Sequence, residues 1–347
     1  MRWIVQSILA CGAVLLVAVA LIFSLLVIMT LVPGLRGPTI YTQPGLQSGV
    51  GRIAFVGHSQ TGARDIFIMN ADGSGQVNLT DSPEPKAAPT WSPQGDRIVF
   101  SVSQDGQDNL AVTNLNGIVT PLTDGGYSPS WSPDGEHIAF VSRRNAEQWP
   151  DVAIVTADGS LHHRITRTPA AETRPRWSPN GHHIVFSTGA HGSVYVIDAD
   201  GTNQQKLGDG DTPTWSPDST QLAFTSTEPG VGIQVVDVTG ALRYTIAGIT
   251  PHWSPQGTHI AFLTRFQGGE RASLMIVEAN GAHPQTLVED IPWWTEIQWS
   301  PDGRWMVFTN GLTLHPEQAW ISIINIDGSD RTRLADGSQP TWQPRPE

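Results

Sequence analysis

Cysteine is nearly absent from this sequence of 347 residues, and charged residues are few. The single cysteine, Cys11, excludes an intrachain disulfide framework and a structural zinc site built mainly of cysteine thiolates. Only 15% of the residues are charged, and 20 Lys and Arg against 32 Asp and Glu give a formal net charge of −12. No block of basic residues occurs, which argues against binding to nucleic acid, because phosphate contacts need clustered Lys and Arg.

Long hydrophobic runs are also rare, and the one that is present lies at the N-terminus. Residues 8–32 form 25 consecutive residues without a charge. About 20 apolar residues cross a hydrocarbon core of roughly 30 Å, so this run can span a membrane with some tilt. A cleaved signal peptide is the alternative, but its apolar region runs only about 7–15 residues and ends in a small-residue cleavage site, which is not evident here.

The sequence therefore predicts three regions. Residues 1–33 are expected to form an uncleaved signal anchor with one transmembrane helix, and residues 34–50 form a linker with Gly or Pro every few positions. Residues 51–347 form the domain that follows. Arg2 before the hydrophobic run and Arg36 after it give only a small charge difference, which favours export of this domain.

Tryptophan, glycine and proline are abundant, and they belong to an internal repeat. Trp-Ser-Pro occurs six times and Trp-Gln-Pro closes the series, at Trp91, Trp131, Trp177, Trp215, Trp253, Trp299 and Trp342. The spacings are 38 to 46 residues. Each unit continues with a Pro/Gly turn, a short apolar strand that ends in Phe, a second apolar strand, an Asp-Gly turn and a last short strand. Four short strands per unit, without helical periodicity after the anchor, predict the antiparallel blades of a β-propeller.

The two ends of the repeat region are complementary. Residues 53–80 supply three strands of a unit that lacks its Trp strand, and the chain closes with the Trp strand at residues 340–342. The last strand is therefore expected to complete the first blade, which removes open sheet edges. The predicted fold is an all-β, seven-bladed β-propeller closed by a C-terminal strand clasp and preceded by one N-terminal transmembrane helix.

The repeat resembles a known family. The pattern P-x-W-S-P-D-G-x-x-I-A-F, followed by D-I-x-x-x-x-x-D-G, is similar to the WD40-like (PD40) repeat of the TolB propeller superfamily, and it covers residues 51–342. This resemblance implies a β-propeller and, commonly, an extracytoplasmic location in bacteria. TolB itself resembles a soluble protein with an α/β domain and six blades, whereas this chain has a hydrophobic run and seven units. We therefore transfer the fold and not the Tol–Pal role.

Candidate site residues lie in the variable loops. The path of a blade places the Trp-Ser-Pro and Asp-Gly turns at one face, the lower face, and the variable loops at the opposite, upper face, where a scaffold carries function. Arg174 and Arg176 precede a motif Trp where other units carry Thr or Ser, and the loop with Arg143, Arg144 and Trp149 is expected beside them. Together they predict an anion or acidic-partner site. Surface arginines paired with Glu147 or Glu172 are the alternative.

Two further candidates lie near the expected channel mouth. Trp293 and Trp294, with Glu296, suit stacking on a sugar, a peptide or a base, unless one Trp packs between blades and the other covers a long loop. His252 comes just before a motif Trp and is expected to face the channel, although a lone His is more often structural. The histidines do not form a matched ligand set, so neither a metal nor another cofactor is expected.

Two hypotheses for the function follow. The first is a non-catalytic, monomeric, membrane-anchored propeller of the bacterial cell envelope that binds a protein, peptide or glycan on its upper face and does not bind nucleic acid. The alternative is a polysaccharide-active lyase or hydrolase that uses His252, Glu296 and Arg176 at the channel mouth. A sensor or assembly subunit is a third, lesser hypothesis.

Overall fold

The structure, a computed structural model, describes residues 51–143, 149–166, 168–189, 192–265, 269–312 and 315–344. The predicted anchor and linker lie outside these residues, and so does Arg144. Across the described ranges, no helix is long and apolar enough to cross a membrane.

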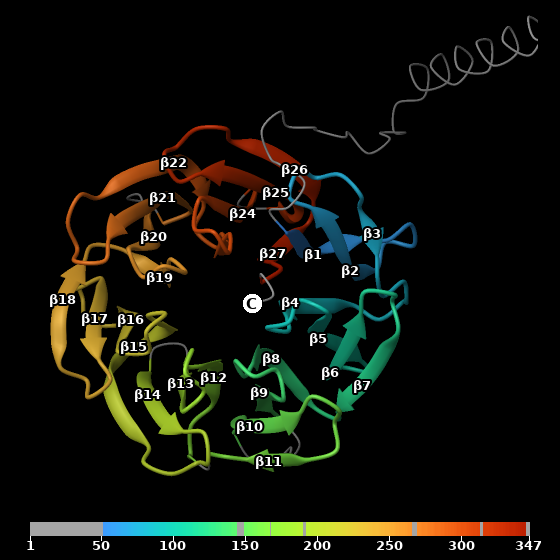
Figure 1. Cartoon of the computed structure of the whole chain (residues 1–347), viewed down its shortest axis with the longest axis horizontal. Helices are drawn as coiled ribbons and strands as arrows, with labels where there is room; N and C mark the ends of the chain where they lie inside the picture. The colour runs from blue at the N-terminus through green and yellow to red at the C-terminus, as the bar shows by residue number, and fades with distance from the viewer. Residues whose placement is uncertain are drawn as a thin grey trace, which may run out of the picture. The chain divides into compact units, whose positions relative to one another are not determined.

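The described strands form antiparallel sheets that are arranged around a common axis (Figure 1). The first three sheets, in order of hydrogen bonding, are β27 (Ser338–Trp342), β1 (Arg52–His58), β2 (Arg64–Asn70) and β3 (Val77–Asn78); β4 (Lys86–Trp91), β5 (Arg97–Gln104), β6 (Gln107–Asn114) and β7 (Val119–Thr123); and β8 (Gly126–Trp131), β9 (His137–Ser142), β10 (Asp151–Thr156) and β11 (His162–Arg164). This arrangement confirms the predicted all-β propeller-like fold.

The next sheet has seven strands because one long strand serves two groups. Its order is β12 (Glu172–Trp177), β13 (His183–Thr188), β14 (Ser193–Asp198), β15 (Gln205–Trp215), β16 (Gln221–Ser226), β17 (Ile233–Asp237) and β18 (Leu242–Ile246). The first part of β15 pairs with β14 and its second part, from Gly210, pairs with β16. The strand is therefore the fourth of one group and the first of the next.

Two four-stranded sheets complete the ring. They are β19 (Ile249–Trp253), β20 (His259–Arg265), β21 (Arg271–Glu278) and β22 (Gln285–Pro292); and β23 (Ile297–Trp299), β24 (Trp305–Leu312), β25 (His315–Asn325) and β26 (Thr332–Asp336). The last strand, β27, then pairs with β1 through Trp342 opposite Ile53 and Thr341 opposite Ala54. The predicted completion of the first sheet by the C-terminal strand is thus confirmed.

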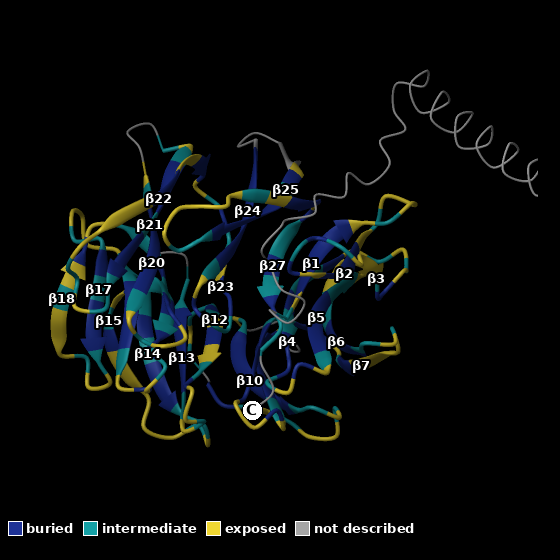
Figure 2. Cartoon of the chain, turned by 45° about the horizontal axis from the view of Figure 1, so that its top comes forward, coloured by how far each residue is buried: buried dark blue, intermediate teal, exposed yellow. Residues whose placement is uncertain are grey.

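The core lies between neighbouring sheets, whose facing side chains pack together in shared hydrophobic clusters. Exposed residues gather in the loops and on outer strands such as β18 (Figure 2). The second strand of each four-stranded group carries a buried phenylalanine. These residues are Phe55, Phe100, Phe140, Phe186, Phe224, Phe262 and Phe308. In several sheets this ring packs on a glycine near the start of the inner strand. A Cβ on Gly248 would lie 2.3 Å from Phe262 Cδ2, and one on Gly126 would lie 2.6 Å from Phe140 Cδ2. The repeat therefore needs glycine there for space.

Motif tryptophans join each four-stranded group to the group before it. Four indole N–H groups donate to the carbonyl that precedes the motif Trp of the preceding group: Trp91 to Thr341 at 3.1 Å, Trp131 to Thr90 at 3.1 Å, Trp215 to Arg176 at 3.2 Å and Trp299 to His252 at 3.0 Å. Among the described residues, the Nε1 atoms of Trp177, Trp253 and Trp342 have no hydrogen-bond partner. The indole hydrogen bond thus connects the inner strands at four of the seven positions.

A bulge three residues before the motif Trp makes a second connection. Residues there have φ between 51° and 55° at Ala88, Ser128, Arg174, Thr212, Thr250 and Gln339. This left-handed conformation is strained for residues other than glycine, at about 1–3 kcal/mol each. The bulge turns the N–H out of its own sheet: Thr250 N donates to Thr225 Oγ1 at 2.8 Å, and Gln339 N donates to Glu296 Oε2 at 2.8 Å. The strain is therefore offset by hydrogen bonds to the preceding sheet.

Candidate functional site

The residue just before each motif Trp lies on an innermost strand and faces the axis. The residue two positions before the motif Trp is buried in every unit, and the motif Trp itself is buried in six of the seven units. The residue directly before the motif Trp is instead partly or fully exposed in every unit except at Ser130. The innermost strands surround the axis in Figure 1. We call this set the axial ring: Thr90, Ser130, Arg176, Thr214, His252, Gln298 and Thr341. Arg176 and His252 are its two titratable members.

Arg176 is exposed to solvent, and its guanidinium has no carboxylate partner among the described residues. Its Nη1 donates only a long hydrogen bond of 3.4 Å to the carbonyl of Pro175. The pKa of Arg176 is lowered, first by burial among the protein atoms around it and second by the charge of Arg174. Its backbone is fixed, because its carbonyl accepts the hydrogen bond from Trp215. The axial ring thus presents one positive charge without a counterion.

His252 shares this space. Burial and, second, the positive charge of Arg176 lower the pKa of His252 to about 4, so the imidazole is neutral at pH 7. The two residues lie on β12 and β19, which are separated by the inner strand of the group that begins in β15. The backbone of His252 is also fixed, through the hydrogen bond from Trp299. A guanidinium and a neutral imidazole therefore face the axis from two sheets.

Arg174, the second arginine of the predicted patch, has a structural contact. Its guanidinium pairs with Asp211 on β15. Glu172 was the alternative partner, and the structure excludes it for this role. Glu172 is buried and accepts hydrogen bonds from Val152 N at 2.8 Å, from Thr168 Oγ1 at 2.9 Å and from the Thr166 hydroxyl. Burial raises the pKa of this carboxyl. Of the two predicted arginines, Arg176 remains available to a ligand.

The predicted residues of the loop between β22 and β23 differ in their surroundings: Trp293 is exposed, whereas Glu296 is hydrogen-bonded within the fold. Trp293 is 41% exposed, and the guanidinium of Arg265 lies 4.4 Å from its ring centre. Trp294 is half-buried. Glu296 accepts hydrogen bonds from Thr309 Oγ1 at 3.1 Å and from Gln339 N at 2.8 Å, and burial raises its pKa. Trp293 is thus accessible, whereas the Glu296 carboxylate connects β24 and β27.

The described residues of the predicted loop with Arg143 and Trp149 make contacts away from Arg174. Arg143 lies 4.6 Å above the ring of Tyr127 and 3.9 Å from Asp108. Trp149 is 61% exposed. Arg143 pairs with Asp108 on β6, in the preceding sheet, whereas Arg174 pairs with Asp211 on β15, in the second half of its own seven-stranded sheet. The described contacts do not bring these two arginines together.

The structure adds two side chains that the sequence patterns did not select. Arg265 is the last residue of β20, and its guanidinium lies over the ring of Trp293. Its place at the end of an apolar strand was the feature of the sequence that could have indicated it. Gln298 is the exposed member of the axial ring between the strands of His252 and Thr341. Its position before a motif Trp was readable from the repeat.

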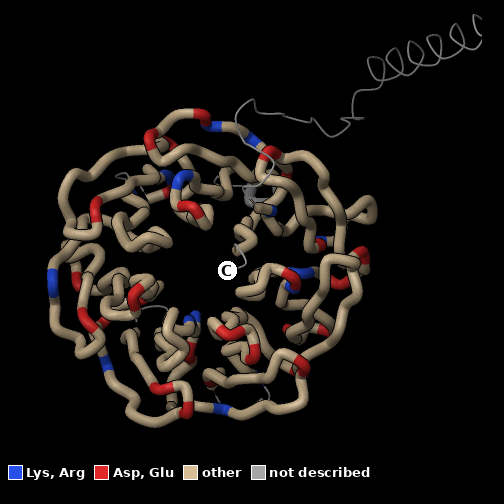
Figure 3. The backbone as a smooth tube through the Cα atoms, viewed as in Figure 1, with Lys and Arg blue, Asp and Glu red and all other residues tan. Residues whose placement is uncertain are grey.

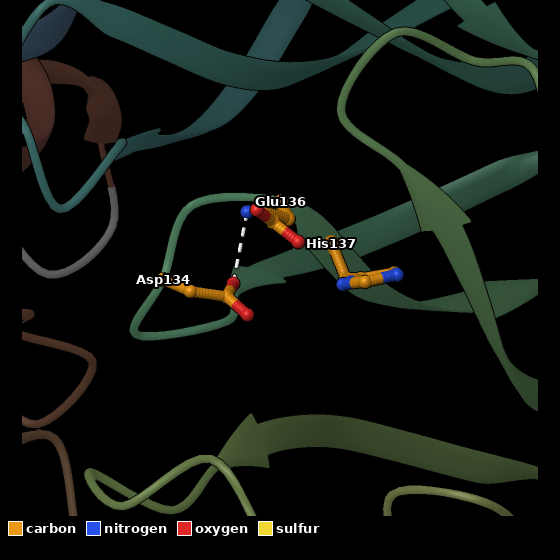
Figure 4. Close-up of side chains that lie close together, drawn as sticks. All are labelled: Asp134, Glu136 and His137. Atoms are coloured by element: carbon orange, nitrogen blue, oxygen red, sulfur yellow. Dashed lines mark hydrogen bonds between the residues drawn. The ribbon is translucent and has the colours of Figure 1, made fainter.

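One group of possible metal ligands lies in a lower turn. Asp134, Glu136 and His137 each offer a ligand atom within 4.8 Å of the others (Figure 4). Asp134 Oδ1 already accepts the hydrogen bond from Glu136 N at 2.9 Å, and the Ser132 hydroxyl donates to the same atom. Both acidic residues are exposed. The turn explains this arrangement without an ion.

The repeat and the sheet order define a β-propeller built from Trp-Ser-Pro units. The chain belongs to the TolB β-propeller domain family (PD40), which matches residues 47–196 and 190–345. It is similar to the "Protein TolB homolog" of Chlorobaculum tepidum, with 27% identity over 117 residues, which are 33% of this chain and 27% of the relative. The "Tol-Pal system protein TolB" of Actinobacillus succinogenes is 34% identical over 64 residues, 18% of this chain and 15% of the relative. The chain thus matches less than a third of the length of either relative.

Solved structures share the fold. TolB from Acinetobacter baumannii superposes with a TM-score of 0.59 at 20% identity, over 85% of this chain and 67% of that one. Oligogalacturonate lyase in complex with manganese superposes with a TM-score of 0.60 at 14% identity, over 82% of this chain and 86% of that one. At such identities the likeness concerns the fold alone.

Proposed function

We propose that this protein is a non-catalytic interaction module whose propeller binds a protein or peptide, or a glycan, through the upper face and the axial ring. Membership of the TolB propeller family and a relative named for the Tol-Pal system support a protein partner. We further propose that residues 8–32 anchor the chain in a membrane and that the propeller acts outside the cytoplasm, in a bacterial cell envelope. The uncharged run of residues 8–32 supports the anchor.

We propose that this propeller has seven blades. The shared strand β15, which pairs with β14 and with β16, supports two groups of four within the seven-stranded sheet, and β27 completes the sheet of β1. With the other four sheets, these groups support one blade for each motif tryptophan. The seven units of the sequence support the same count.

The observation that carries the proposed function is the composition of the axial ring. The repeat fills this position with Thr, Ser or Gln in five units, none of which carries a charge. Arg176 replaces them with a cation that has no carboxylate partner among the described residues. A charge that the described contacts leave unpaired favours recognition of an external group, and the exposed ring of Trp293 offers a second contact.

Capture of a partner tests this proposal. The full chain in detergent, carrying an affinity tag, is incubated with an envelope extract, and the bound proteins are compared for the wild type and the double variant Arg176→Gln/Trp293→Ala. We expect the double variant to lose the captured protein and to keep the circular dichroism spectrum of the wild type. Arg243→Gln is the matched control, because Arg243 is an exposed arginine on the outer strand β18, where it pairs with Asp237. Equal capture by the double variant would refute the proposed site.

A polysaccharide lyase or hydrolase is the second candidate. One observation favours it: His252 is neutral at pH 7 beside Arg176, as a proton acceptor next to a cation would be. Glu296, the carboxylate of that hypothesis, is instead committed to Thr309 and Gln339. Turnover of a glycan panel by the wild type, lost in His252→Ala, would establish the enzyme. A stoichiometric transition metal in the purified protein would also favour the enzyme.

A further inference from the structure

We propose that Arg176 and His252 form a carboxylate-binding site on the propeller axis and that its ligand is an acidic side chain of a peptide segment of the partner. This inference rests on the proposed binding of a protein or peptide partner. It assigns the chemical group that the axial ring recognises.

Position is the first argument. Arg176 and His252 occupy the same repeat position on two inner strands. The backbone carbonyl of each accepts a hydrogen bond from the indole of the following motif tryptophan, Trp215 and Trp299 respectively. Corresponding side chains therefore leave the backbone at matched heights toward the axis. A rigid backbone reduces the ordering cost when the side chains close on a ligand.

The balance of charge is the second argument. Arg174 is neutralised by Asp211, and the Glu296 carboxyl accepts its hydrogen bonds from Thr309 and Gln339. Arg176 then stands as a cation without a carboxylate partner in the part of the chain that the structure describes, although the formal net charge of the chain is −12. Acidic residues lie both on the outer parts of the ring and on loops nearer the axis in Figure 3. The attraction of an acidic ligand to the axis is therefore local and comes from Arg176.

The chemistry of the donors selects a monoanion. A guanidinium holds a carboxylate through two parallel N–H bonds, and a neutral imidazole adds one donor. Gln298 and Thr214, in the same ring, offer an amide and a hydroxyl. A phosphate dianion carries a second negative charge that the single cation does not compensate, whereas a carboxylate matches this cation in charge and in its two acceptor oxygens.

The sheet edges favour a peptide as the source of this carboxylate. β12 and β19 are the edge strands of their sheets, and they are the strands that carry Arg176 and His252. Edge strands offer backbone donors and acceptors to an extended chain, while side-chain sites give specificity. A peptide can use both features at once, and a polysaccharide offers no such backbone.

Binding of defined oligomers to the full chain tests the inference. A fluorescein-labelled, capped hexaglutamate peptide is titrated at low salt, with a capped hexaglutamine peptide, hexagalacturonate and inorganic phosphate as comparisons. We expect hexaglutamate to bind in preference to all three. Arg176→Gln should weaken its binding at least tenfold and His252→Gln about threefold, and Arg176→Lys should retain part of the affinity.

A control variant and four contrary outcomes make this titration decisive. Arg243→Gln removes one positive charge from the outer strand β18 and should leave the affinity unchanged. Equal affinity of Arg176→Gln and wild type, equal binding of hexaglutamine, or absence of binding would overturn the carboxylate site. Binding of hexagalacturonate without hexaglutamate would overturn the peptide and assign the site to an acidic glycan.

The envelope-extract assay separates this inference from the proposed function. If the wild type captures a protein and the single variant Arg176→Gln captures it equally, the interaction module stands and the carboxylate site is overturned. If the wild type captures no protein, the proposed function fails, and the hexaglutamate titration still decides whether the axis holds a carboxylate.

Discussion

The indole hydrogen bonds between sheets predict that two equivalent tryptophans contribute unequally to stability. Trp131 and Trp253 occupy the same repeat position and are 7% and 9% exposed. Trp131 Nε1 donates to Thr90 O at 3.1 Å, whereas Trp253 Nε1 has no hydrogen-bond partner among the described residues. The substitutions Trp131→Phe and Trp253→Phe remove the same atoms from two positions of similar burial. The guanidinium of Arg97 lies 5.0 Å from the ring centre of Trp131, and a phenylalanine there keeps an aromatic face for this cation. Only Trp131→Phe also breaks a hydrogen bond and leaves a carbonyl without its donor.

The difference between the two variants can be worked out from these contacts. A net hydrogen bond contributes about 0.5–1.5 kcal/mol, and an unsatisfied buried group costs about 1–3 kcal/mol. Trp253→Phe removes an N–H that the native fold leaves unpaired, which offsets part of its packing loss. We expect Trp131→Phe to lower the free energy of unfolding by about 1–2 kcal/mol more than Trp253→Phe does.

Urea unfolding of both variants measures this difference. Tryptophan fluorescence and far-ultraviolet circular dichroism should give coincident transitions, so that one free energy of unfolding describes each protein. Equal destabilisation by the two substitutions, or a larger loss in Trp253→Phe, would refute the role assigned to the indole hydrogen bonds.

Three further predictions concern the axis and the core. Arg176→Gln should raise the pKa of His252 from about 4, because it removes a positive charge that opposes protonation; histidine C2-proton titration by NMR checks this, and an unchanged pKa would mean that the two side chains do not share the axis. Glu296 has a raised pKa in the fold, so the wild type loses stability as the pH rises above the unfolded value of 4.5; Glu296→Gln keeps an acceptor oxygen and should gain thermal stability relative to wild type between pH 4 and pH 7, and a constant difference would contradict the burial effect. Gly248→Ala should cost about 1–3 kcal/mol in urea unfolding, because its Cβ would meet Phe262, and the second substitution Phe262→Leu should recover part of the loss.

The repeat determined the strands because its signals are local. Each Pro/Gly turn, each apolar triplet that ends in Phe and each motif Trp lies within one unit of the chain. The period of two in the strands and the turn chemistry then fix which residues enter the core. For this reason the burial of Phe140 and the pairing of Ile53 with Trp342 could be predicted without coordinates. The residues of the anchor, and Arg144, stay predictions, since they lie outside the described ranges.

The roles within the candidate site depended on contacts between sheets, which no local pattern encodes. Arg174 and Arg176 are two residues apart, yet one pairs with Asp211, 37 residues further on, and the other has no carboxylate partner among the described residues. Glu296 was predicted as a ligand group, and a strand 43 residues away makes it a structural acceptor for Gln339.

The sequence by itself determined the family, the strands, the closure of the ring and the position at which Arg176 and His252 depart from the repeat. Only the tertiary structure decided which of the side chains that differ from the repeat make hydrogen bonds or ion pairs within the fold. The reason is physical: hydrogen-bond partners and burial are properties of neighbouring sheets, and they are set by how the units pack around the axis rather than by the order of residues within a unit.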